Sequence, residues 1–329
     1  MKNFSYLRAT STEEAVQQAS QETCFIAGGT NLVDRMKAFL DAPATLIDIS
    51  RLDLKEINIL PDGGVKIGAM VTNTDLANHP HIRENYPLLS RAILAGASQQ
   101  IRNMATVGGN LLQRTRCPYY YDTAFACNKR QPESGCSARE GINRMHAIFG
   151  ASEHCVAVHP SDMCVALSAL DAVVEVEGAN GKGEIPFADF HRLPEDTPQQ
   201  DTTLETGDLI TAVRLPSKPA AKTGVYLKLR DRASYAFALV SVAAMVKVEN
   251  EIIQQAHLAL GGVAHKPWRL LETEAFLQGK PATATTFEEA AELALQDAQP
   301  LTHNQFKVKM SQRAIKRALN ISTQGGGIA

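Results

Sequence analysis

The sequence predicts a mixed α and β protein with two domains, because short apolar strands alternate with helices along the chain. A chain of 329 residues is long enough for two domains, since one domain takes roughly 150 residues. The polar stretch SKPAAKTG at 217–224 interrupts the alternation and is the expected domain junction. Hydrophobic residues make up 44% of the chain and charged residues 21%, which is ordinary for a soluble globular protein.

Charge and hydropathy argue against two classes of partner. The net charge is −2, so electrostatics gives no reason to expect binding to nucleic acid or to an anionic membrane. No apolar run approaches the roughly 18 residues needed to span a bilayer, so we expect no membrane insertion. The first twenty residues hold no apolar segment and no twin arginine. We therefore expect no signal peptide, and synthesis and folding in the cytoplasm.

Local patterns place the elements of the first domain. Residues 11–21 predict a helix, since Ser11 or Thr12 can cap it and acids occupy its first turn. Residues 86–104 have apolar positions at helical spacing, which predicts a longer helix. Residues 161–178 predict a helix that runs into a strand. The other expected strands lie in TCFIA before a Gly-Gly turn, in TLIDISRL at 45–52, within 63–76 and at 208–216.

The second domain is expected to combine a hairpin with helices. An apolar segment that begins at SYAFALVSVAAM leads into a predicted hairpin, which turns at Glu249 to Glu251. Residues 287–298 and 304–319 predict two helices.

Two glycine turns carry the first sign of a binding site. AGGTNL at 27–32 and TVGGN at 106–110 each follow an apolar segment and offer Thr or Asn beside paired glycines. Glycine lets a main chain approach a ligand closely, and consecutive outward N–H groups form a nest for an anion. Neither motif is the GxGxxG fingerprint or a P-loop, and each alone fits a plain β-turn. Together they could hold the two phosphates of a dinucleotide.

Five ordered motifs identify a family resemblance. FIAGGTNLVDRMK, LIDISRL, IGAMVTNTDL, ATVGGNLL and HPSD resemble the FAD-binding subunit of the molybdenum hydroxylases, the xanthine dehydrogenase, aldehyde oxidoreductase and carbon monoxide dehydrogenase family. The resemblance extends over essentially the whole chain, including RDRASYAFALVSVAAM and LGGVAHKPWR. It implies an α+β fold in which a two-lobed FAD-binding domain of the PCMH type, residues 1–216, precedes a smaller α+β domain, residues 217–329.

The resemblance also implies the residues that contact FAD. Asp162 in HPSD resembles the acid that bonds the adenosine ribose, and a vicinal diol suits a carboxylate acceptor. Ile210 resembles the apolar contact on the adenine side, and Lys228 resembles the lysine near the flavin. The implied pyrophosphate loop is Ile26, Ala27, Gly28, Gly29, Thr30, Asn31 and Leu32, and the implied second loop is Thr106, Gly108, Gly109 and Asn110.

Four clustered cysteines lie in an insertion at about 113–156. Asn110 and Asp162 are 52 positions apart, whereas the usual member of the family joins these motifs by a short stretch. The spacing C-x9-C-x8-C-x18-C is neither a zinc ribbon nor a ferredoxin run. RTRCPYYYDTAFACNKR resembles the segment that carries an extra [4Fe-4S] cluster in the subunits of periplasmic aldehyde oxidoreductases. The implied ligands are Cys117, Cys127, Cys136 and Cys155.

Other occupants of the cysteine loop stay open at this point. Zinc also takes four thiolates, and two disulfides could form in an oxidising compartment. Six basic residues against four acids in the insertion would offset the negative charge of a cluster. His146 and His154 lie in the loop but are not needed as ligands, and Cys24 and Cys164 are expected to be small buried hydrophobes.

The chain carries no nucleophile–base pair, no paired acids and no molybdenum-binding signature, so we infer an electron-transfer subunit. The resemblance implies that it carries FAD and a [4Fe-4S] cluster. The resemblance implies a molybdenum-cofactor large subunit that oxidises an aldehyde, a [2Fe-2S] small subunit and an external electron acceptor. The alternatives are a flavin-free scaffold stapled by zinc and a stand-alone flavoenzyme. The resemblance favours the periplasm, reached by export with a signal-bearing partner, over the cytoplasm.

Overall fold

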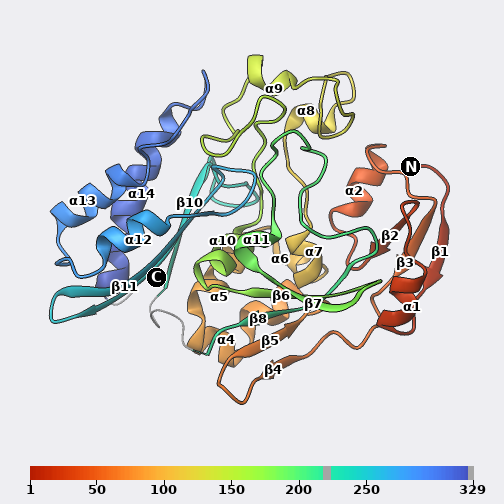
Figure 1. Cartoon of the computed structure of the whole chain (residues 1–329), viewed down its shortest axis with the longest axis horizontal. Coiled ribbons are helices and arrows are strands. Elements are labelled where there is room, and N and C mark those ends of the chain that lie inside the picture. The colour runs from red at the N-terminus through yellow and green to blue at the C-terminus, as the bar shows by residue number, and fades with distance from the viewer. Residues whose placement is uncertain (218–223, 325–329) are drawn as a thin grey trace.

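The computed structural model describes residues 1–217 and 224–324 and builds them around three separate sheets (Figure 1). Helices and strands are mixed throughout, so the predicted α+β fold class is confirmed. Most of the predicted junction, residues 218–223, lies outside the described residues. No helix in the described ranges is long and apolar enough to cross a membrane.

The N-terminal lobe is a small parallel sheet with two helices. The strand order is β1-β3-β2, and the helices lie in the connections between the strands. The side chain of Ser11 accepts a hydrogen bond from the Glu14 N–H, which confirms the predicted cap, although the helix ends at Gln17 rather than at 21. The elements are β1 (Ser5–Arg8), α1 (Thr12–Gln17), β2 (Thr23–Ile26), α2 (Leu32–Lys37) and β3 (Thr45–Asp48).

The second lobe is an antiparallel sheet covered by helices. Its order is β4-β5-β8-β6-β7, and one large core joins the sheet to the helices. The predicted helix and strand within 161–178 are confirmed as α10 and β6, and every residue of α10 is buried. The strands are β4 (Ile57–Ile59), β5 (Val65–Gly68), β6 (Val173–Gly178), β7 (Gly181–Pro186) and β8 (Leu209–Leu215). The helices are α3 (Asn73–Asn78), α4 (Pro80–Asn85), α5 (Pro87–Ala95), α6 (Gln99–Arg102), α7 (Val107–Leu111), α10 (Asp162–Ala169) and α11 (Phe187–Phe190).

The prediction of a single helix over 86–104 is wrong, because the structure has two helices there, α5 and α6. Gly96 ends α5, Ala97 has a φ of 52°, and Ser98 begins the next helix by accepting a hydrogen bond from the Ile101 N–H. A Cβ on Gly96 would lie 3.0 Å from an Asp162 carboxylate oxygen. The break therefore makes room for a side chain that comes from α10.

The cysteine insertion forms the top of the molecule in Figure 1 and has little regular structure. It contains only two short helices among its described residues, α8 (Pro118–Tyr121) and α9 (Ser137–Glu140). A single antiparallel bridge pairs Cys127 with Cys136. Main-chain turns, such as the bond from the Asn128 N–H to the Gly135 carbonyl, and side-chain hydrogen bonds supply the remaining order.

The sheet of the C-terminal domain lies between two hydrophobic cores, one shared with the second lobe and one within the C-terminal domain. Alternate residues of β10 face opposite sides: Ala243 and Met245 pack with the helices of the second lobe, whereas Val242 and Ala244 pack with the helices of the C-terminal domain. The predicted hairpin turn is confirmed at Asn250 and Glu251, which both have positive φ. The strands are β9 (Val225–Leu229), β10 (Val240–Glu249), β11 (Ile252–Gly261) and β12 (Trp268–Arg269). The helices are α12 (Leu271–Leu277), α13 (Ala284–Leu293) and α14 (Phe306–Thr323), and the last two confirm the predicted helices with shifted ends.

Candidate functional site

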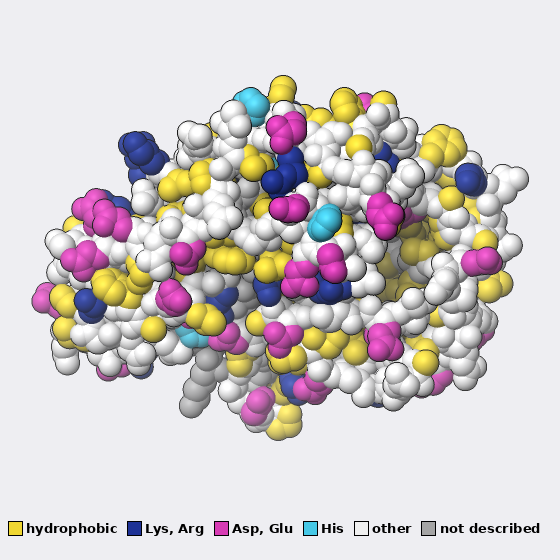
Figure 2. Space-filling view, turned by 45° about the horizontal axis from the view of Figure 1, so that its top comes forward, with side chains coloured by type: hydrophobic (Ala, Val, Ile, Leu, Met, Phe, Trp, Pro, Cys, Tyr) yellow, Lys and Arg dark blue, Asp and Glu magenta, His cyan; other side chains and the backbone are white. Residues whose placement is uncertain are grey.

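A cavity of about 900 Å³ lies between the N-terminal lobe and the second lobe. Both glycine turns line it, together with Ile210 and the segment 199–206. Figure 2 shows a hollow with hydrophobic side chains on the side of the molecule where the N-terminal lobe lies. The volume falls within the range of roughly 300–1,000 Å³ that small-molecule sites occupy.

Close main-chain packing sets the shape of the two glycine turns. A Cβ on Gly28 would lie 1.8 Å from the carbonyl oxygen of Met104, so no other residue fits there without moving the main chain. Gly29 has a φ of 70°, which favours glycine. The side chain of Thr106 accepts a hydrogen bond from the Gly109 N–H at 3.2 Å and begins α7. The two turns therefore support each other.

The first turn offers main-chain donors to the cavity. The carbonyls of Gly29 and Asn31 accept hydrogen bonds from the N–H groups of Val33 and Arg35. Within residues 1–217 and 224–324, by contrast, the N–H groups of Gly29, Thr30 and Asn31 have no acceptor. Three neighbouring N–H groups without acceptors, at the wall of a cavity, form a nest that suits a phosphate.

A second cavity, of about 530 Å³, adjoins the first. The two share Thr30, Asn31 and Gly109 in their walls, so the glycine turns lie at their junction. Asn110, Asp162, Lys228 and the segment 231–237 line the second cavity. The pair of cavities has room for an extended ligand with its anionic centre at the turns.

A buried ion pair stands in the wall of the second cavity. The Nζ of Lys228 lies 2.8 Å from an Asp162 carboxylate oxygen and donates a second bond, of 3.1 Å, to the carbonyl of Ala95. The Tyr226 hydroxyl donates to the other Asp162 oxygen at 2.6 Å. Burial and the Asp162 carboxylate raise the pKa of Tyr226. Both Asp162 oxygens therefore already have partners.

The structure distributes Asp162, Ile210 and Lys228 over the two cavities. The sequence placed Asp162 with Ile210 at the adenosine end and Lys228 at the flavin end. Asp162 and Lys228 form one ion pair in the second cavity, whereas Ile210 lines the first. Proximity in the fold, which sequence order does not reveal, decides this grouping.

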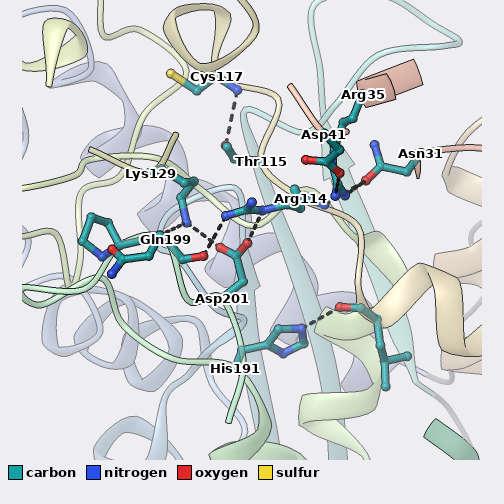
Figure 3. A network of polar contacts seen from close by, with 12 residues as sticks. Asn31, Arg35, Asp41, Arg114, Thr115, Cys117, Lys129, His191, Gln199 and Asp201 are labelled. Carbon is teal, nitrogen blue, oxygen red and sulfur yellow. Dashed lines mark hydrogen bonds and ion pairs between the residues drawn. The ribbon is translucent and has the colours of Figure 1, made fainter. Parts of the chain in front are cut away.

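The sequence missed Asp201, a carboxylate of the first cavity (Figure 3). Arg114 donates to it through Nε at 2.6 Å, and Lys129 donates through Nζ at 2.5 Å. Burial would raise the pKa of Asp201, but the two cations lower it well below its ordinary value. Asp201 lies in the polar stretch EDTPQQDTTLET, which has no motif. The basic residues near the cysteines were the one available signal, and their common partner could not be inferred from them.

The four predicted cysteine ligands lie in one neighbourhood. The hydrogen bond with Cys155 lowers the pKa of Cys136 to about 6, and the same bond with burial raises the pKa of Cys155 well above its ordinary value. Burial raises the pKa of Cys117 to about 12, and the neighbouring Cys127 and Cys136 act in the same direction. The Nε2 atom of His146 lies 3.1 Å from the sulfur of Cys117. The structure thus brings together residues that span 39 positions of the chain.

Two of the four loop sulfurs, those of Cys136 and Cys155, lie within hydrogen-bonding reach of each other. Among the described residues, the one group of three His, Cys or acidic ligand atoms that lie within 4.8 Å of one another is His159, Cys164 and His191. No three sulfurs of the four loop cysteines are therefore that close. A tetrahedral zinc site with Zn–S bonds of about 2.3 Å would hold its sulfurs about 3.8 Å apart. All six cysteines are free, so the structure holds no disulfide.

Two families of known proteins cover the chain. Residues 2–218 match the family described as the FAD binding domain in molybdopterin dehydrogenase, and residues 225–321 match the CO dehydrogenase flavoprotein C-terminal domain. The chain therefore belongs to the family of FAD-binding subunits of the molybdenum hydroxylases, as its five motifs predicted. It is a subunit of an oxidoreductase of the aldehyde oxidoreductase and xanthine dehydrogenase type.

Individual relatives and solved structures agree with this family. The chain is 50% identical to the aldehyde oxidoreductase FAD-binding subunit PaoB of Escherichia coli (strain K12), over 97% of this chain and 98% of that protein. It is 31% identical to the glyceraldehyde dehydrogenase medium chain of Sulfolobus acidocaldarius, over 84% and 82% of the two chains. Its fold matches a carbon monoxide dehydrogenase structure from Hydrogenophaga pseudoflava with a TM-score of 0.77 at 25% identity, over 99% of both chains.

Proposed function

We propose that this chain is the FAD-containing electron-transfer subunit of a molybdenum-dependent aldehyde oxidoreductase. The observation that carries the proposal is the pair of cavities joined at two glycine turns, with free N–H groups at the junction. The relative that is 50% identical is named as an aldehyde oxidoreductase subunit, which supports the aldehyde as substrate of the complex. We place the FAD-binding domain at residues 1–216 and the second domain at 217–329.

The chemistry of both cavities fits FAD. The nest at Gly29, Thr30 and Asn31 provides main-chain donors for the pyrophosphate. When bound, FAD supplies the redox chemistry, including both one-electron and two-electron steps. The protein binds and orients it. Lys228 keeps a positive charge at the wall of the second cavity, and Asp162 holds that charge in place. The proposed FAD contacts are Ile26, Ala27, Gly28, Gly29, Thr30, Asn31, Leu32, Thr106, Gly108, Gly109, Asn110, Asp162, Ile210 and Lys228.

For the cysteine loop we propose a [4Fe-4S] cluster on Cys117, Cys127, Cys136 and Cys155. The four sulfurs lie in one neighbourhood of the loop, and four thiolates are the ligand set that such a cluster takes. Lys129 is buried close to the loop, and its charge would offset part of the negative charge of a thiolate-bound cluster. The cluster would add a one-electron centre to the subunit.

The partners follow from the proposed role. A molybdenum-cofactor large subunit would oxidise the aldehyde, and a [2Fe-2S] small subunit would deliver the electrons to FAD. An external acceptor would then take them. The relatives named as a FAD-binding subunit and as a medium chain support a multi-subunit arrangement. We place the complex in the periplasm by export with a signal-bearing partner, and cell fractionation would distinguish this from the cytoplasm.

An absorption spectrum, with iron and acid-labile sulfide analysis of anaerobically purified protein, tests the proposal. We expect flavin bands together with about four irons and four sulfides per chain. Flavin with zinc and no iron would retain the FAD proposal, and the metal would then only stabilise the fold of the loop. Zinc without flavin would instead favour the scaffold. Turnover of an aldehyde by the isolated chain would overturn the assignment of the substrate site to a partner.

A further inference from the structure

Two cationic side chains lead from the cysteine loop toward the first cavity (Figure 3). Arg114 precedes Cys117 by three residues, and Lys129 follows Cys127 by two. Both bond the same carboxylate, Asp201, at 2.6 and 2.5 Å. The Lys129 side chain is only 1% exposed, and its Nζ donates a further bond to a main-chain carbonyl. The position of Lys129 therefore depends on the conformation of the loop around Cys127.

The same network reaches the first glycine turn. The Arg114 N–H donates to the Asn31 side-chain oxygen at 3.1 Å. Arg35 donates to the same oxygen at 3.3 Å and also pairs with Asp41. Asn31 contributes an N–H group to the nest and lines both cavities. A continuous set of polar contacts thus joins two segments that are 83 positions apart in the chain.

The segment around Lys129 is also joined to the other cysteines. The Asn128 side chain donates to the carbonyl of His154, next to Cys155, at 3.0 Å, and accepts from the Gly135 N–H, next to Cys136, at 2.8 Å. A ligand that holds the four sulfurs would therefore also hold Lys129 against Asp201.

The charged side chains that join the two sites carry a net positive charge. Two cations, Arg114 and Lys129, face one carboxylate, Asp201. A buried net positive charge is costly unless anions lie nearby. Anions would lie on both sides: thiolates at the loop and a pyrophosphate at the nest. The positive charge attracts both anions, but two anions by themselves repel each other, so the coupling between the sites comes from the shared positions of Arg114, Lys129 and Asp201.

We propose that Arg114, Lys129 and Asp201 couple the two sites, so that filling the cysteine loop strengthens FAD binding and FAD strengthens retention of the iron. This inference rests on the proposed function and adds regulation of cofactor binding to it. The three are positioning residues. When the loop is empty, the segment around Cys127 is held less firmly, so Lys129 holds Asp201 less firmly, and the bond from the Arg114 N–H that orients Asn31 weakens in turn.

The test is FAD affinity of the full chain, measured by quenching of flavin fluorescence. Iron is left in place or removed anaerobically with ferricyanide and a chelator, and it is restored with iron, sulfide and a reductant. We expect FAD to bind about tenfold more tightly to the loaded protein, within the 5- to 150-fold range usual for coupled sites. Reciprocity requires that saturating FAD strengthen iron retention by the same factor.

In Lys129→Met, FAD should bind about equally well to the iron-loaded and the iron-free protein, so the ratio of these two affinities falls to about one. The variant should still take up iron. Asp201→Asn is the second variant and should act in the same direction, in case the first fails to fold. Lys66→Met is the control, because it removes another lysine–carboxylate pair, with Glu175 at 2.6 Å, outside both sites. Thermal unfolding of each variant monitors general damage. The ratio should be unchanged in the control.

Two results would overturn the coupling. One is a wild-type ratio near one in protein that binds both iron and FAD, and the other is a ratio that stays near tenfold in Lys129→Met. Both leave the proposed function intact. Wild-type protein that binds FAD but takes up no iron contradicts the cluster itself, and the coupling is then overturned with it.

Discussion

The glycine turns and the cysteine loop are both candidate cofactor sites, but they are built in different ways. Main-chain contacts shape the turns: Gly28 packs against the carbonyl of Met104, and Thr106 caps α7. The cysteine loop has two short helices, one isolated bridge and many side-chain bonds. A site made by main-chain packing keeps its shape without a ligand. A loop with little regular structure gains much of its order from the group that it binds.

Gly28→Ala should have the largest effect, because it changes the first glycine turn directly, where the main chain is closely packed. The added Cβ would meet the Met104 carbonyl oxygen, and the main chain would have to move. We expect complete loss of flavin from the purified protein and about 1–3 kcal/mol of destabilisation. Iron should remain bound, although less firmly. Flavin absorbance and iron content measure both.

Gly183→Ala is the matched control for Gly28→Ala. Its added Cβ would make only an ordinary contact, 3.6 Å from Val176. It should keep its flavin. Retention of a full flavin complement by Gly28→Ala would contradict the role of the first turn.

Cys127→Ser should have the converse effect. Loss of one thiolate ligand should remove most of the iron, while flavin still binds at saturating FAD because the turns do not depend on the loop for their shape. Cys24→Ser is the control, since Cys24 lies outside the loop, in β2. Iron analysis and the flavin spectrum give the result. Equal iron in the two variants would argue against the four-cysteine assignment.

Lys228→Met tests the wall of the second cavity. It would leave Asp162 buried with Tyr226 as its remaining partner. Breaking a buried ion pair from one side costs about 3–5 kcal/mol. We expect a loss of stability of that size in denaturant unfolding of the flavin-free protein. Lys228→Arg should recover part of it, and a cost below about 1 kcal/mol would mean that water already solvates this pair.

Acid should weaken the apoprotein through its buried histidines. Burial lowers the pKa of His191 to about 4, from an unfolded value near 6.5, so the unfolded state binds more protons between these values. Stability therefore falls as pH drops from about 6.5 to about 4, by up to about 3 kcal/mol for this one group.

His191→Gln should flatten that pH dependence, and His154→Gln, at an exposed site, should leave it unchanged. Denaturant unfolding from pH 7.5 to 4.5 measures the slope. An identical slope in wild type and His191→Gln would mean that His191 is not buried in the neutral form.

Much of the fold could be predicted because it depends on local patterns. The cap at Ser11, the helix-to-strand passage at 161–178 and the hairpin near Asn250 are set by residues close in sequence. The helix over 86–104 was predicted as continuous because its apolar periodicity continues through Gly96. Its interruption depends on Asp162, which approaches from another helix and has no local signal.

The sequence by itself determined the family, the two glycine turns and the four cysteines, because residue types at short spacing specify turns and soft metal ligands. Only the tertiary structure decided which distant groups meet. It paired Asp162 with Lys228, and it brought Arg114 and Lys129 to one carboxylate, Asp201. The reason is physical: a buried charge needs an opposite charge within a few ångströms, and the fold, not the order of residues, determines which one is there.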